Sequence, residues 1–202
     1  MNVRRLRWLA LCAVWLTGCA GQGPIPYQPM APNAQAGKID LFVELQLTER
    51  FQSTALDAVL QRQYKWLLGD ALSQHAETMA RMLFRDVVVT RPGAAPTDRP
   101  VQAILTPSAQ AFFIAPMIAF TSATVTVALN WELATPTGKT IWSDQIGGKV
   151  TEVWGVGYTW NSNLGEALGT ATREAFGKSA QVMSNAPQIR AFAADPGPGV
   201  DR

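Results

Sequence analysis

The sequence predicts an α+β domain: one mixed, mostly antiparallel sheet of about five strands with two helices packed on one face. Two patterns predict it. Residues 123–133 alternate apolar and polar side chains, which is typical of a strand with one buried face. Residues 64–85 and 163–183 repeat apolar side chains every three or four positions, which is typical of helices. Packing both helices on one face of the sheet would bury these apolar side chains.

Five segments have the composition of strands and are separated by turn-forming residues. The predicted strands cover residues 39–47, 86–90, 101–114, 123–133 and 140–153. The sequence TPTGK at residues 135–139 joins the last two as a hairpin, because proline presets one backbone angle and glycine supplies a positive φ. We expect a disturbance at Pro107 in the third strand and a bend at Gly147–Gly148 in the fifth. The polar residues 48–62 are compatible with a loop or a short helix.

The first predicted helix lies within residues 64–85. Its apolar stripe consists of Leu68, Leu72, Ala76, Met79 and Leu83. Glycine lowers helix stability by about 1 kcal/mol relative to alanine, so Gly69 favours a start at Asp70, whose side chain can cap the first turn. The second predicted helix covers residues 163–183 and ends before Pro187.

The first 18 residues have the features of an export signal. Three arginines among the first seven residues precede a short apolar run at residues 9–16. A membrane-spanning helix needs about 20 apolar residues, so this run is too short to span a bilayer. The sequence LTGC at residues 16–19 follows and resembles a bacterial lipobox. That resemblance implies cleavage before Cys19 and lipidation of its thiol. From the residues alone, the alternative is a buried cysteine in an ordinary N-terminal helix.

Composition divides the rest of the chain. Residues 19–37 are rich in proline and glycine, which predicts an extended, unpacked tether. The expected organisation is a signal peptide at 1–18, this tether, a single α/β domain at 38–185 and a flexible C-terminal tail at 186–202. In enteric bacteria an aspartate directly after the lipidated cysteine resembles an inner-membrane retention signal. Ala20 at that position therefore implies the outer membrane, with the domain facing the periplasm.

Charge and cysteine content exclude several classes of function. Three of the 17 Lys and Arg residues and none of the 15 Asp and Glu residues lie before Cys19, so the mature chain would carry 14 basic and 15 acidic residues. This balance gives no electrostatic reason to expect a nucleic-acid partner. Removal of Cys12 with the signal would leave Cys19 without a disulfide partner. With His75 as the one histidine, no zinc ligand set is expected, and no metal or cofactor is predicted.

No group of residues predicts catalysis. His75 lies beside the apolar stripe of its helix, so a packed side chain is favoured over a general base. The sequence has no G-x-S-x-G motif of serine hydrolases. Asp40 and Glu44 would lie too far apart along a strand to act together as a general acid and base. Glu132 and Asp144 could be cross-strand neighbours, but a position on a solvated sheet face explains them at least as well as a catalytic role. We therefore expect no catalytic residues and a protein that is not an enzyme.

Large aromatic side chains gather where the sheet is predicted to give way to the last helix. Trp154, Tyr158 and Trp160 lie in a seven-residue stretch that also holds two glycines. Such residues are enriched in protein interfaces, so we predict that these three bind a partner, with core packing as the alternative. Residues 112–114 and Met117 form a second apolar cluster with the same two interpretations.

The lipobox, the proline-rich segment and the order of elements together resemble a group of small envelope lipoproteins. The group includes the YajG-type lipoproteins and shares a fold with the N-terminal domain of TolB and with the CsgG-like lipoproteins. The sequence LFRDV at residues 83–87 and the sequence GKTIW at residues 138–142 are similar to elements of those proteins, and the resemblance covers roughly residues 39–184.

This resemblance implies a non-enzymatic accessory or structural component of a cell-envelope assembly. Its partners would be the membrane, through the lipid anchor, and other envelope proteins. The alternative is a module that binds lipid or another hydrophobic ligand in an envelope transport system. A concave pocket lined by the aromatic side chains would favour the ligand-binding module, and a convex aromatic surface would favour protein contacts.

The two interpretations of the aromatic residues predict different effects of Trp160→Ala. If Trp160 contacts a partner, the domain should stay folded and association should weaken by about 2 kcal/mol or more. If Trp160 belongs to the core, the free energy of unfolding should fall by roughly 3–5 kcal/mol. Thermal melts and pull-downs on this one variant separate the outcomes, and a large loss of melting temperature would contradict an interface role.

Overall fold

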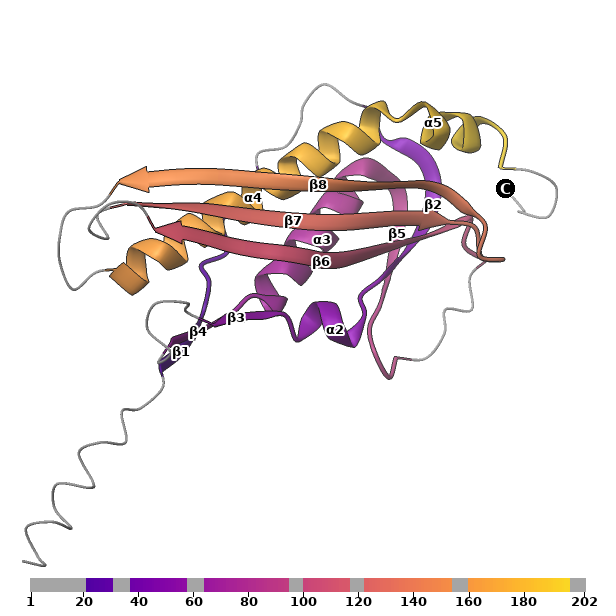
Figure 1. Cartoon of the computed structure of the whole chain (residues 1–202). Helices are drawn as coiled ribbons and strands as arrows, with labels where there is room; N and C mark the ends of the chain where they lie inside the picture. Colours follow the sequence, from indigo (N-terminus) through magenta and orange to yellow (C-terminus); the bar gives the residue numbers. More distant parts are fainter. Residues whose placement is uncertain are drawn as a thin grey trace, which may run out of the picture.

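The computed structural model describes residues 21–30, 37–57, 64–94, 100–116, 122–153 and 160–196. They form an α+β fold with a five-stranded mixed sheet and a separate three-stranded sheet. Helices α3 and α4 lie side by side behind the larger sheet (Figure 1). The α+β class and the five-stranded mixed sheet are therefore as predicted, whereas the second sheet was not expected.

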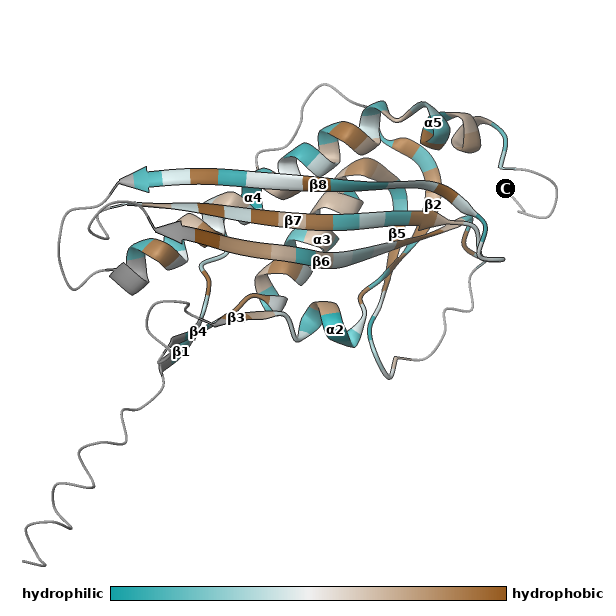
Figure 2. Ribbon diagram, viewed as in Figure 1, coloured by the Kyte–Doolittle hydropathy of each residue, from teal (hydrophilic) through white to brown (hydrophobic). Residues whose placement is uncertain are grey.

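The larger sheet has the strand order β5-β2-β6-β7-β8. Its strands are β5 (Phe84–Thr90), β2 (Ile39–Gln46), β6 (Ala103–Pro116), β7 (Ser122–Ala134) and β8 (Thr140–Val153). Strand β2 pairs in parallel with both β5 and β6, and the long β6-β7-β8 meander is antiparallel. Side chains alternate between buried and more exposed along β7, and Figure 2 shows the matching change from hydrophobic to hydrophilic.

Pro107 does not interrupt β6, contrary to expectation. It lies in register with Trp131, and the irregularity falls instead between Ala109 and Ala111. Strand β2 pairs only with residues 103–105 of β6, so Pro107 lies beyond the part of β6 that has neighbours on both sides. Proline is tolerated at such an edge because no neighbouring strand requires its missing N–H.

The smaller sheet has the order β1-β4-β3 and corrects the prediction of an unpacked tether. Strand β1 (Gly21–Pro24) pairs in parallel with β4 (Tyr64–Leu67), which pairs antiparallel with β3 (Ala55–Asp57). A proline- and glycine-rich segment has an extended backbone, and here that backbone is used as a strand. The partner strand lies some forty residues further along the chain.

Helix α3 (Gly69–Leu83) begins one residue earlier than predicted, with Leu68 as its N-cap. The expected cap, Asp70, lies inside the first turn, where its charge favours the helix dipole. A Cβ atom on Gly69 would lie 1.6 Å from the carbonyl oxygen of Gln52, at the end of the short helix α2 (Glu49–Gln52). Gly69 is therefore needed because α2 approaches the backbone of α3 closely.

Helix α4 (Trp160–Asn185) is longer than predicted, and a further helix, α5 (Pro187–Ala194), follows it. Pro187 occupies the first turn of α5, where its missing N–H costs nothing. Ile189 of this helix is fully buried. The expectation of a flexible tail from residue 186 is thus wrong for residues 187–194.

The outer edge of β8 is capped by a side chain of α4. The Lys149 backbone N–H donates to Glu174 Oε2 at 3.2 Å, and Lys178 pairs with Glu174 Oε1 at 2.6 Å. The hydrogen bond from Lys178 holds the pKa of the Glu174 carboxyl below its usual range. At neutral pH the carboxylate is therefore charged and available to accept the strand's hydrogen bond.

Gly148, where a bend was expected, has a different role: it allows α4 to approach β8 closely. A Cβ atom on Gly148 would lie 2.1 Å from the carbonyl oxygen of Ala171 and 2.6 Å from the backbone nitrogen of Ala175. Both atoms belong to helix backbone and cannot rotate away. The absence of a side chain lets α4 pack directly on the strand.

We predict that Gly148→Ala lowers the free energy of unfolding by about 3 kcal/mol, because the added methyl group forces α4 off the sheet. Gly177→Ala is the matched control: no atom lies within 4 Å of its added Cβ, so it should stabilise α4 by up to about 1 kcal/mol. Urea unfolding followed by tryptophan fluorescence measures both changes. Equal stabilities of the two variants would contradict the close-packing role of Gly148.

Candidate functional site

The residues predicted to be functional lie mostly outside the described part of the chain. This holds for Cys19, Trp154 and Tyr158. Trp160 is the first residue of α4, but its side chain is not among those that the structure describes. Lipidation at Cys19 and partner binding by the three aromatic residues therefore stay predictions.

The described segment nearest to Cys19 is residues 21–30, here called the anchor-proximal segment. Its first part is β1, and the strand's hydrogen bonding continues beyond it with the Ile25 N–H donating to the Leu67 carbonyl oxygen at 3.3 Å. The Ile25 side chain is buried in the main core. This attachment differs from the expected free tether, although an isoleucine and a tyrosine among the prolines are signs of packing.

Two glycines of α4 lie against the small sheet and the anchor-proximal segment, and only Gly169 is in a contact too close for a side chain. At Gly165 an added Cβ would lie 3.6 Å from Trp66 Nε1 of β4. At Gly169 it would lie only 2.8 Å from the carbonyl oxygen of Pro26. The glycines are four residues apart and so lie on one face of the helix, which thereby offers a shallow backbone surface to the segment.

Polar contacts fix the position of the segment along α4. Gln28 Nε2 donates to the Glu166 carbonyl oxygen at 3.4 Å, and Thr170 Oγ1 donates to Gln28 Oε1 at 3.3 Å. The hydroxyl groups of Tyr27 and Thr78 are 3.3 Å apart, which links the segment to α3 as well. The segment is therefore attached to both long helices.

His75 lies at the centre of this attachment and is fully buried, as predicted from its position beside the apolar stripe. Its ring contacts Tyr27 at 4.6 Å and stacks on Phe176 of α4 at 5.2 Å between centroids. Neither ring nitrogen has a hydrogen-bond partner among the described residues. Burial, and secondly the positive charge of Arg173, lower the pKa of His75 from 6.5 to about 4. The ring is therefore neutral at physiological pH and packs as an aromatic side chain.

Three of the four carboxylates considered for acid–base catalysis have surface roles. Glu132 accepts a hydrogen bond from Thr140 Oγ1 at 2.9 Å, and Asp144 accepts one from the backbone N–H of the next residue at 2.7 Å. Asp40 forms an ion pair with Arg85, and both side chains are well exposed. No group of three or more His, Cys, Asp or Glu residues in the described ranges is placed to hold a metal ion.

The β6-β7-β8 meander carries a hollow of about 510 Å³ on its surface. Its lining is mostly polar: Thr106, Ser108, Asn130, Trp131, Glu132, Ser143, Asp144 and Gln145. A site for a hydrophobic ligand is usually lined by apolar side chains, so this hollow does not fit one.

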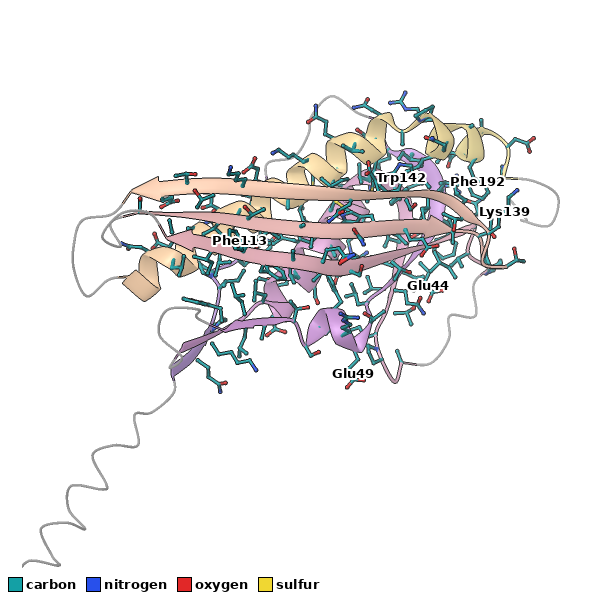
Figure 3. All side chains as sticks on the ribbon, viewed as in Figure 1. Glu44, Glu49, Phe113, Lys139, Trp142 and Phe192 are labelled. Carbon is teal, nitrogen blue, oxygen red and sulfur yellow. The ribbon has the colours of Figure 1, made fainter. Side chains whose placement is uncertain are left out.

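The apolar cluster predicted at residues 112–114 is divided between core and surface. Ile114 is buried, whereas Phe113 is 62% exposed on β6 (Figure 3). Met117 lies outside the described residues.

No protein-family model and no curated protein matches the sequence. Solved structures do match the fold. A protein of the DUF330 family from Xanthomonas campestris is 12% identical, with a TM-score of 0.53 over 88% of this chain and 100% of that one. A homolog of neuraminyllactose-binding hemagglutinin from Helicobacter pylori is 9% identical, with a TM-score of 0.51 over 85% of this chain and 97% of that one. At these identities the likeness shows a shared fold alone.

We predict that acid weakens the fold through His75. Its folded pKa of about 4 lies below 6.5, so the stability that depends on a neutral ring is present above pH 6.5 and is lost as the pH falls toward 4. The full loss corresponds to about 3 kcal/mol. His75→Phe keeps an aromatic ring between Tyr27 and Phe176 but cannot take up a proton.

Urea unfolding of both proteins between pH 7 and pH 4 checks this prediction. Because both proteins share all carboxylates and this chain has one histidine, the difference between the two profiles isolates His75. Parallel profiles would contradict the buried, neutral state of the ring.

Proposed function

We propose that this chain is a lipid-anchored bacterial envelope lipoprotein, cleaved before Cys19 and acylated on its thiol. The observation that carries the proposal is the position of the lipobox-like sequence relative to the fold. Strand β1 begins at Gly21, two residues after Cys19, so removal of residues 1–18 takes nothing from the described domain. No described helix is long and apolar enough to cross a membrane. In this proposal the acyl chains on Cys19 hold the protein at the membrane.

The proposed role is that of a non-enzymatic accessory or structural component of an envelope assembly. Two findings support it in the described residues. The one histidine is buried and neutral, and three of the four carboxylates considered for catalysis, Glu132, Asp40 and Asp144, are engaged by Thr140, Arg85 and a backbone N–H. We place the anchor in the outer membrane because Ala20 follows Cys19, and we assign partner contacts to Trp154, Tyr158 and Trp160.

The two cysteines of the chain provide a matched test of the anchor. In protein extracted from bacterial membranes, we expect intact mass spectrometry to show loss of residues 1–18 and an added lipid mass. Cys19→Ser should remove the lipid mass and leave the precursor unprocessed, because the thioether to diacylglycerol requires a thiol. Cys12→Ser should give a mature mass identical to the wild type, since residue 12 lies in the removed segment.

Three further results bear on the same proposal. Separation of inner and outer membranes by density should recover the wild type with the outer membrane and shift Ala20→Asp toward the inner one. A wild-type protein that keeps residues 1–18, or carries an unmodified Cys19, would contradict the anchor. A hydrolytic activity of the purified protein that a folded His75→Phe variant loses would contradict the non-enzymatic role.

A further inference from the structure

The distance between the proposed anchor and the folded domain is very short. One residue, Ala20, separates Cys19 from β1, and two residues of extended chain span at most about 7 Å. The polar headgroup layer on each side of a bilayer is about 5–7 Å thick. A chain with acyl groups on Cys19 therefore brings Gly21 to the level of the lipid headgroups.

The anchor-proximal segment cannot act as a spacer, because it is attached to the domain along its length. Pairing with β4, the burial of Ile25 and the contact of Tyr27 with His75 fix it to the small sheet and to both long helices. From Gly21 to Met30 the chain runs over the domain and adds no reach toward the membrane.

We infer that the domain lies directly on the surface of the bilayer that holds its anchor, with the small β1-β4-β3 sheet against the phospholipid headgroups. The inference rests on the proposed acylation of Cys19 and adds to it a defined contact surface. It replaces the expected tether, which would have held the domain away from the membrane.

Strand register identifies the side chains of this contact surface. Gln22 is in register with Lys65, and Pro24 with Leu67, and all four are exposed. The residue between Lys65 and Leu67 is Trp66, which is buried against the main core. The outer face of the small sheet therefore carries a lysine and a leucine that is 40% exposed.

These two side chains have the chemistry of a headgroup contact. A lysine ammonium can pair with a lipid phosphate, and its apolar stem can lie along the acyl boundary. Gln22 lies at most about 11 Å from Cys19 along the chain, and Lys65 is on the adjacent strand about 5 Å away. Both Lys65 and Leu67 are therefore close enough to reach the headgroup layer.

The opposite end of the molecule provides an internal reference. Figure 1 shows β1 and β4 at the end where α4 begins, and Figure 3 shows Lys139 at the other end, in the turn between β7 and β8. Strand β8 has 14 residues, so its two ends are about 45 Å apart. A domain that lies on the membrane through its small sheet keeps Lys139 away from the headgroups.

The test uses the full mature lipoprotein with a single fluorescent label. The lipid blocks the thiol of Cys19, so one introduced cysteine is the one free thiol of the mature chain. We would label Lys65→Cys and Lys139→Cys separately and reconstitute each into phosphatidylcholine–phosphatidylglycerol vesicles that contain a lipid with a nitroxide on its headgroup. We expect the label at position 65 to lose most of its fluorescence and the label at position 139 to lose little. Gln22→Cys is a second position that should behave like position 65.

An inserted spacer supplies the decisive control. Twelve Gly and Ser residues between Ala20 and Gly21 add a flexible chain with a reach of roughly 20 Å. The quenching at position 65 should then fall toward that at position 139, while the lipid mass on Cys19 stays unchanged. Equal quenching at positions 65 and 139, or quenching that the spacer does not reduce, in protein that carries the lipid would overturn the inference. Protein without the lipid would instead overturn the proposed function, and its mass reveals this before reconstitution.

Discussion

The close packing of helix α4 is the constraint on which the rest of the structure depends. At three positions another part of the chain lies against α4, and one residue of each contact is a glycine. Gly148 of β8 lies against Ala171 and Ala175, while Gly165 and Gly169 of α4 itself lie against Trp66 and Pro26. At Gly148 and Gly169 a side chain as small as a methyl group would push the helix away from the sheet and from the anchor-proximal segment, whereas at Gly165 it would only make van der Waals contact with Trp66. The same helix thus joins the large sheet to the small one.

This arrangement makes the attachment of the anchor-proximal segment part of the core. Phe176 of α4 packs edge-on against Trp131 of the large sheet at 5.6 Å and stacks on His75, which in turn contacts Tyr27. The indole N–H of Trp131, which is buried with these aromatic rings, donates a hydrogen bond to Ser179 Oγ at 2.9 Å. Strain on the anchor-proximal segment would therefore act on the centre of the domain.

Local patterns were sufficient to predict the five long strands, helix α3 and most of α4, because each has several periods of apolar side chains. They could not predict β1, β3 and β4, which have only three or four residues each and derive their stability from pairing across the chain. The roles of Gly69 and Gly148 also depend on tertiary contacts, since the same residue type is equally compatible with a helix start or a bend.

The candidate site shows the same limit. The sequence around Cys19 indicates lipidation through a short motif, but the following prolines and glycines have the composition of a free linker. The contacts of Tyr27 and Gln28 with two helices determine that this segment is bound instead, and those contacts involve residues 48 to 142 positions away. Composition indicates whether a segment is compatible with an extended linker, but its contacts with the rest of the domain determine whether it is bound.

The capped edge of β8 has a consequence for neighbouring copies of the protein. A fourteen-residue edge strand offers unpaired N–H groups along which another polypeptide can add a strand. With the proposed anchor on Cys19, copies in one membrane would share an orientation and meet in two dimensions, so their edges would encounter each other far more often than in free solution. The Glu174 carboxylate occupies the N–H of Lys149 and places a negative charge beside the strand. At Lys149, this contact opposes the pairing of β8 with an edge strand of a neighbouring copy.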